Sequence, residues 1–401
     1  MEIKSEHAKK IDTYLKDCPE IGKWPVEIAG TKHILPFYKF PISLLAYNPN
    51  NGRLAMERLE WEETNKRKLD VFDSETNEIV RKLLLSLDKD KTDTLKADIS
   101  AKSQMEPGVI THDGVVINGN RRMAVLELLH QEQPTGKWQF LDAVRLGTDI
   151  TEKDLWKIEA GLQLSKDKIA EYHPVNELLK IKEGLQAGLS IDEVAQAMYG
   201  RTKDEVLVAQ QRLELIDRFL EFWGQPNNYG LLKKFGLHEY FIDLQNNLVG
   251  PGRKQGLSGR ELQMRLEMAF TLLRANILAQ KASNNSKDIT HWQFRKIGKI
   301  LEDPMINDAF TQHLMEAKKR KGGSVKDVPH QVVIDDYYAG LDRLEMKLEK
   351  DAPIKLITRA INALESIDRK SKHIHEEHVQ HAMGRLAKVV DELAGIIKTR
   401  R

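Results

Sequence analysis

The stretch DGVVINGNRRMAVLELL, residues 113–129, limits the possible folds of this chain most narrowly. Its β-branched residues at 115–117 favour a short buried strand, and Gly119 permits the sharp turn that follows. The next apolar residues recur with helical spacing, at Met123, Val125, Leu126 and Leu129. We therefore expect a strand, a turn and a helix in direct succession, with an Asp-Gly hairpin turn at 113–114 before the strand.

The start of that helix suits an anionic ligand. A helix N-terminus offers backbone N–H groups and the positive end of a dipole, and Gly119 allows close approach to the backbone. Arg121 and Arg122 add planar cationic groups that match phosphate oxygens. The pattern predicts a phosphate or triphosphate site, although an ordinary strand–turn–helix with surface arginines has the same spacing. It is not a Walker loop, because no GxxxxGK[ST] occurs.

The composition favours a helix-rich intracellular protein. The 401 residues are enough for two to four domains, and 41% hydrophobic with 30% charged residues is typical of helical, soluble chains. The net charge of +2 argues neither for nor against nucleic acid. Cys18 is the only cysteine, so neither an intrachain disulfide nor a thiolate zinc site is expected. With no signal-peptide pattern and no membrane-length apolar run, we expect a cytoplasmic protein without membrane contact.

Three regions follow from the order of strand, helix and turn signals. Residues 1–150 predict a small α+β domain, with an irregular segment around the prolines at 25, 36 and 41. Residues 151–224 predict helices that start after Thr151, at Pro174, after Ser190 and after Thr202. Residues 225–401 predict an α-helical region. Its tail at 379–397 has heptad-like spacing, which favours either a homodimer or a local bundle.

The region from about residue 35 to 220 resembles the ParB/sulfiredoxin family. The signature strand–turn–helix, roughly DGxxxxGxxR followed by alanine, corresponds to Asp113, Gly114, Gly119, Arg122 and Ala124. Upstream, an Asn-Pro turn that ends in arginine corresponds to Asn48, Pro49 and Arg53. Sulfiredoxins carry their catalytic cysteine at the position that is Asn120 here, so sulfinic-acid repair is not expected. The resemblance implies the ParB-like fold with a helix-turn-helix in the middle domain.

ParB-like proteins bind a nucleoside triphosphate, typically CTP, at this turn. The resemblance therefore implies a CTP or ATP site with Mg²⁺, made by Asn48, Arg53, Gly119, Asn120, Arg121 and Arg122. The family's Glu-Asn pair, which resembles a magnesium site, is Glu159-Ala160 in this chain. Glu159 remains a candidate metal ligand, and Gln163 lies one turn further on. The missing amide leaves nucleotide hydrolysis, such as CTPase activity, undecided.

Residues 189–216 resemble a helix-turn-helix. In this interpretation Gly200 makes the turn, and the second helix presents Lys203, Gln210, Gln211 and Arg212 outward to DNA bases and phosphates. The alternative is a helical hairpin used only for packing, since the second helix begins with the acidic pair Asp204 and Glu205.

The sequence and the resemblance together predict a nucleotide-dependent DNA-binding protein. Triphosphate binding would switch its association with DNA, in a plasmid, phage or defence setting, and the helical C-terminal half would bind a second copy or a protein partner. An enzymatic alternative on the same fold is a nuclease or a phosphotransferase, with Glu159 or Asp113 as the base. A third interpretation is a scaffold that uses only its helical half.

Overall fold

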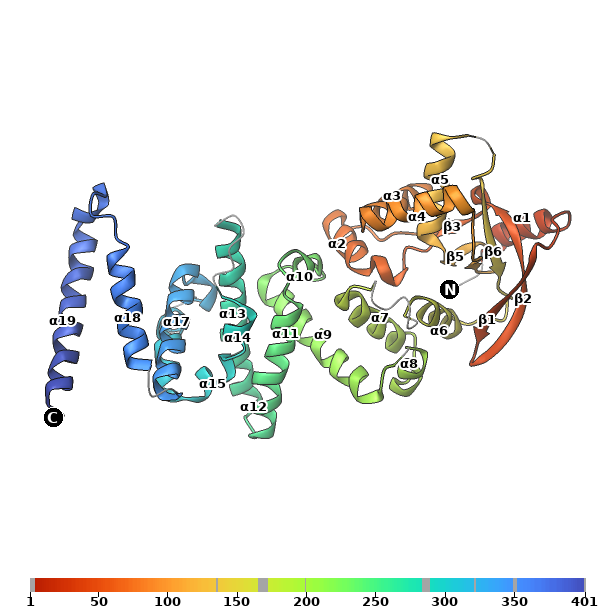
Figure 1. Ribbon diagram of the computed structural model, residues 1–401. Coiled ribbons are helices and arrows are strands. Elements are labelled where there is room, and N and C mark those ends of the chain that lie inside the picture. Colours follow the sequence, from red (N-terminus) through yellow and green to blue (C-terminus); the bar gives the residue numbers. More distant parts are fainter. Residues whose placement is uncertain are drawn as a thin grey trace.

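The computed structural model describes residues 4–134, 136–164, 172–198, 200–282, 289–320, 322–348 and 352–399. The molecule is elongated: a mixed sheet with its helices lies at one end, a body of helices follows, and a two-helix hairpin forms the other end (Figure 1). This is an α+β protein with a helical C-terminal half, as expected.

One six-stranded mixed sheet forms the N-terminal part. Its strands are β1 (Gly22–Ile28), β2 (Thr31–Pro41), β3 (Ala46–Tyr47), β4 (Gly108–Ile110), β5 (Val115–Asn118) and β6 (Phe140–Arg145). They lie in the order β1-β2-β6-β4-β5-β3. The expected hairpin is confirmed, because β4 and β5 pair antiparallel across the turn at 113–114. The pairs β3–β5 and β4–β6 are parallel.

The expectation of an irregular segment after the first helix is wrong, because residues 22–41 form the long hairpin β1–β2. The prolines fit for positional reasons. Pro25 lies on the edge strand β1, which has only one neighbour. Pro36 pairs with β1 alone, since the pairing of β2 with β6 begins at Phe37.

Helices cover both faces of the sheet. One face packs against α1 (Ser5–Leu15), α3 (Ser74–Ser86), α4 (Lys89–Lys102) and α5 (Asn120–Glu132). The other face packs against Ile158 of α6 (Glu152–Gln163), which joins Val26, Ile117 and Val144 in one buried cluster. Figure 1 shows α3, α4 and α5 on one side of the sheet and α6 on the other. A shared core therefore crosses the expected domain boundary at residue 150.

The next helices begin where their caps predict. The Thr151–Asp154, Ser190–Glu193 and Thr202–Glu205 capping boxes are all present, and Pro174 opens its helix. The elements are α7 (Pro174–Gln186), α8 (Ile191–Ala197) and α9 (Lys203–Trp223), with α2 (Ala55–Asn65) packed on α7.

The helical C-terminal half continues the core of α7 and α9. That core joins residues on both sides of 224, from Val175 through Phe219 to Phe270 and Tyr337. Its elements are α10 (Gly230–Lys234), α11 (His238–Leu244), the π-helical η4 (Gln245–Val249), α12 (Gly250–Lys254), α13 (Gly259–Ala282), α14 (His291–Phe294), α15 (Ile297–Glu302), α16 (Pro304–Lys319) and α17 (His330–Leu348). The terminal pair is α18 (Ala352–Glu365) and α19 (Glu377–Thr399). Every described helix falls short of the length and apolarity required of a transmembrane segment.

Candidate anion-binding site

The glycine at the predicted turn is required by the backbone. Gly119 has φ +108°, a conformation that L side chains rarely adopt, and caps the start of α5. A Cβ atom there would lie 3.4 Å from the Cα of Gly108 on the neighbouring strand. Gly119 therefore lets β5 turn into α5 against β4.

Asn120 fixes the loop beside this turn. Its side chain is buried, with Oδ1 accepting from the N–H of Asn48 at 3.0 Å and Nδ2 donating to the carbonyl of Val116 at 2.6 Å. The side chain of Asn48 is likewise buried and accepts from the N–H of Asn50 at 3.0 Å. Both asparagines of the predicted site thus hold the segment 48–54 against α5.

The two arginines of the turn diverge. Arg121 borders a hollow that it shares with Arg53. Arg122 instead donates to the carbonyl of Glu106, and burial lowers the pKa of its guanidinium. Successive residues on a helix point about 100° apart, so the predicted pair cannot converge on one anion from the same side. The structure brings together Arg53 and Arg121, and places Arg122 elsewhere.

The hollow has a volume of about 340 Å³ and lies where six segments meet. Its lining residues are Arg53, Glu57, Leu87, Asp88, Lys91, Arg121, Tyr172, His173, Pro174, Asn176 and Lys233. Four are cationic and two acidic. Lys233 pairs with Glu57 at 3.0 Å, and Lys91 pairs with Asp88 at 3.5 Å. With four cationic and two acidic side chains, the lining carries an excess of positive charge, to which Arg53 and Arg121 contribute.

Tyr172 borders the same hollow, and its hydroxyl is buried. The residue is 7% exposed, and its Oη has no hydrogen-bond partner among the described residues. Burial raises its pKa well above the ordinary value, so the group stays protonated and can donate. An unsatisfied buried hydroxyl is costly. The hydroxyl lies beside Gly52, where an added Cβ would come within 1.9 Å of it, so it packs against the loop that carries Arg53.

Asn176 of α7 holds the backbone that carries Arg53. Its Oδ1 accepts from the N–H of Met56 at 3.1 Å, and its Nδ2 donates to the carbonyl of Arg53 at 2.9 Å. The N–H of Arg53 donates to Oδ1 of Asn51 at 3.1 Å. The loop at 48–56 is thus fixed by buried amides, which is the rigidity that a binding site requires.

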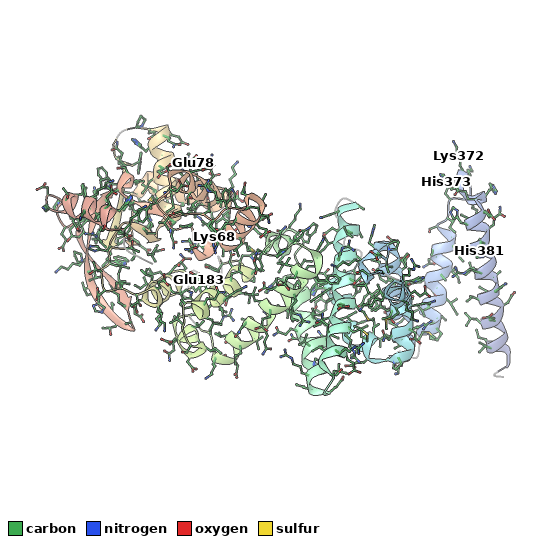
Figure 2. All side chains as sticks on the ribbon, turned by 180° about the vertical axis from the view of Figure 1, so that it is seen from behind. Lys68, Glu78, Glu183, Lys372, His373 and His381 are labelled. Atoms are coloured by element: carbon green, nitrogen blue, oxygen red, sulfur yellow. The ribbon has the colours of Figure 1, made fainter. Side chains whose placement is uncertain are left out.

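Glu159, the candidate metal ligand, is occupied by other groups. Its Oε1 accepts from the N–H of Gly52 at 2.9 Å and from the amide of Gln163 at 3.1 Å. Its Oε2 accepts from Nζ of Lys180 at 2.6 Å, and Lys180 also pairs with Glu183 at 3.1 Å. Figure 2 shows Glu183 on this helical unit.

The ammonium of Lys180 takes the position beside Glu159 that a bound metal ion would need. Burial acts to lower the pKa of Lys180, but Glu159 and Glu183 outweigh it, so its pKa is raised and the group is charged. Within the part of the chain that the structure describes, no cluster of three His, Cys, Asp or Glu residues could hold a metal. The arrangement makes Glu159 a structural partner of Lys180.

Sequence reasoning missed Lys180, Tyr172 and Asn176. The burial of Lys180 could have been predicted, because the residue lies between Leu179 and Ile181 in a helix that buries both neighbours. A lysine at such a position indicates a buried ion pair. Tyr172 and Asn176 carried no comparable pattern, since their roles depend on contacts with the loop at 48–56, far away in the sequence.

The predicted DNA-reading residues do not share one outward face. Lys203 is exposed and pairs with Asp192 at 2.9 Å, while Gln210 is half-buried and donates to Glu214 at 3.3 Å. Gln211 borders a shallow hollow between α9, η4 and α12.

The expected outward position of Arg212 is wrong. Its Nε donates to Gln245 of η4 at 3.1 Å, and burial lowers its pKa. The Gln245 amide in turn donates to the carbonyl of Val208 at 2.9 Å. This side of α9 packs against the π-helical turn, a long-range contact that helical periodicity could not reveal.

Comparison with protein-family models gave no match, and comparison with curated proteins gave none either.

Proposed function

We propose that this chain binds a nucleoside triphosphate, CTP or ATP, with its phosphates between Arg53 and Arg121, and that binding switches its association with DNA. The observation that carries the proposal is the hollow that Arg53 and Arg121 border together, whose lining holds more cationic than acidic side chains. Guanidinium groups match phosphate oxygens, and a volume of about 340 Å³ lies within the range of ligand sites.

The magnesium ion of this proposal arrives with the nucleotide. Mg²⁺ keeps several waters and is commonly held by substrate phosphates with few protein carboxylates. Because Lys180 already neutralises Glu159, the ion needs no ligand from that side chain. This assignment replaces the expected role of Glu159 and leaves the phosphates facing the two arginines.

Helix α7 supplies the connection to the helix-turn-helix. Its N-terminal residues, His173, Pro174 and Asn176, border the hollow. Further along, Glu177 accepts from Nε of Arg201 at 2.7 Å, at the turn between α8 and α9. Lys182 pairs with Asp217 of α9 at 2.8 Å. A ligand that favours one position of α7 would bias α8 and α9 with it, as differential binding to two states requires.

The two carboxylates expected as bases in the enzymatic alternative, Asp113 and Glu159, are held away from the hollow. Asp113 accepts from the backbone N–H of Lys4 at 2.9 Å and from the hydroxyl of Thr111, and Glu159 pairs with Lys180. Neither residue borders the hollow. Phosphoryl transfer needs a carboxylate near the γ-phosphate. The two that border the hollow, Glu57 and Asp88, pair with Lys233 and Lys91, so a binding switch agrees better with these positions than a phosphotransferase does.

Fluorescence anisotropy of a labelled duplex, titrated with protein at several salt concentrations, tests the switch. We expect CTP or ATP with Mg²⁺ to change the DNA affinity at least threefold, and affinity to fall with salt because phosphate contacts release counterions. The variant Arg121→Ala should show the same DNA affinity with and without nucleotide. Identical wild-type curves with and without every nucleotide would contradict the switch.

A further inference from the structure

The hairpin of α18 and α19 exposes large apolar side chains along both helices. Nine of them are between 38% and 66% exposed: Ile354, Ile357, Ile361 and Leu364 on α18, and Met383, Val389, Val390, Leu393 and Ile397 on α19. Single exposed apolar residues are ordinary, whereas a contiguous set marks an interaction surface. The hairpin lies at the end of the molecule farthest from the sheet (Figure 1).

The spacing of these residues is that of packed helices. On α18 the apolar positions 354, 357, 361 and 364 are three, four and three residues apart. On α19 the positions 383, 386, 390, 393 and 397 alternate three and four in the same way. Such heptads place a continuous apolar seam on one side of a helix, where knobs of a partner helix insert.

The hairpin does not bury these seams itself. Helices α18 and α19 approach each other closely at few points, and their large apolar side chains remain exposed. On α18, Arg359 pairs with Asp342 at 3.2 Å and with Glu345 at 2.9 Å, which fastens the helix to α17 by charge. Figure 2 shows side chains pointing outward from both helices, with His373 near their connection and His381 on α19.

The apolar face of α19 is wider than a two-helix seam. Val389 precedes the heptad position at 390, and Ala387 and Ala394 follow those at 386 and 393. The apolar positions therefore include those that flank the seam, whereas charged residues such as Lys388 lie outside it. A face of this width contacts more than one neighbouring helix, as in a four-helix bundle.

We propose that the hairpin of a second copy of this chain covers this surface, so that α18 and α19 of two protomers form a four-helix bundle. Two helices from each copy close a bundle under two-fold symmetry, in which one patch serves both partners. The nine exposed residues offer roughly 900 Å² per protomer, or roughly 1,800 Å² in a pair, which lies within the range of stable protein interfaces.

Sedimentation equilibrium of the full chain between about 1 and 100 µM tests this proposal. We expect the wild type to be a dimer and the variants Ile357→Glu and Leu393→Glu to be at least tenfold weaker in self-association, since each places a charge in the seam. Lys388→Glu is the matched control on the same helix and should remain dimeric. Circular dichroism should show that all variants keep the wild-type helix content.

Three results would overturn the proposal. One is a wild type that stays monomeric at 100 µM with its helices intact. Another is a Leu393→Glu variant that dimerises as tightly as the wild type. The third is a monomer that co-sediments with phosphatidylcholine–phosphatidylglycerol vesicles through the same residues, which would assign the surface to lipid. Because these measurements need no nucleotide and no DNA, their outcome is independent of the triphosphate site.

Discussion

Replacing Lys180 by methionine should destabilise the protein, because it removes the buried cation that pairs with Glu159. The lysine side chain is 1% exposed, and its Nζ lies 2.6 Å from Glu159 and 3.1 Å from Glu183. Methionine has a similar volume, so the change removes a charge without opening a large cavity. The carboxylate of Glu159, also buried, then has no cation at its Oε2.

The size of the stability loss depends on which charges stay buried. Removing one partner of a buried pair costs about 3–5 kcal/mol. The side chain of Glu183 is 43% exposed and can be hydrated, so the loss comes from Glu159. That residue keeps hydrogen bonds from Gly52 and Gln163. We therefore expect a loss near the lower limit, about 3 kcal/mol.

A second substitution separates charge from packing. In Lys180→Met/Glu159→Gln the buried charge is gone while a side-chain oxygen still accepts from Gly52, so the net loss should shrink to about 1 kcal/mol. Urea denaturation followed by circular dichroism gives the free energies of unfolding. If the double variant were no more stable than Lys180→Met, the reasoning from an uncompensated carboxylate would be refuted. The stability loss caused by Lys180→Met should also be smaller at pH 5 than at pH 8, because a buried carboxylate without a cationic partner takes up a proton more readily at the lower pH.

Further predictions concern the loop, the acid range and the two arginines. Gly52→Ala should lower the urea midpoint, because its Cβ would lie 1.9 Å from Oη of Tyr172. Adding Tyr172→Phe to the same chain should restore part of the loss, which urea denaturation of the two single variants and the double variant checks. Burial lowers the pKa of His238 from 6.5 to about 4. Between these pH values the unfolded chain binds a proton that the folded chain does not, so stability should fall as the pH drops from 6.5 to 4. Urea midpoints measured over this pH range should fall less in His238→Gln than in the wild type. Arg121→Ala should weaken nucleotide binding at least tenfold. Arg122→Ala should leave nucleotide affinity within twofold but lower the melting temperature, because Arg122 donates to the carbonyl of Glu106. Equal losses of nucleotide affinity in both variants would contradict the divergence of the two side chains.

Local patterns predicted the elements whose causes are local. The capping boxes at Thr151, Ser190 and Thr202 set three helix starts, because each is satisfied within four residues. The strand, Gly119 turn and helix were predicted for the same reason, since the positive φ of Gly119 suits glycine.

Features that depend on distant contacts could not be predicted in this way. The prolines of residues 22–41 argued against regular structure, yet Pro25 lies on the edge strand, Pro36 pairs with one neighbouring strand only, and Pro41 ends β2. Arg212 faces η4 because Gln245 lies there, and Glu159 is a structural anion because Lys180 reaches it from another helix. Of the three arginines predicted for the site, Arg53 and Arg121 border the hollow and Arg122 does not.

Isothermal titration of CTP, ATP and GTP, each with Mg²⁺, into the wild type and into Arg53→Ala and Arg121→Ala tests the central claim most directly. We expect one nucleotide to bind the wild type at one site per chain, and affinity to drop at least tenfold in each variant while circular dichroism stays unchanged. Inorganic triphosphate should compete with the bound nucleotide, because the arginines contact phosphates. A folded wild type that binds none of the three nucleotides, or variants that bind as tightly as the wild type, would contradict the assignment of this hollow.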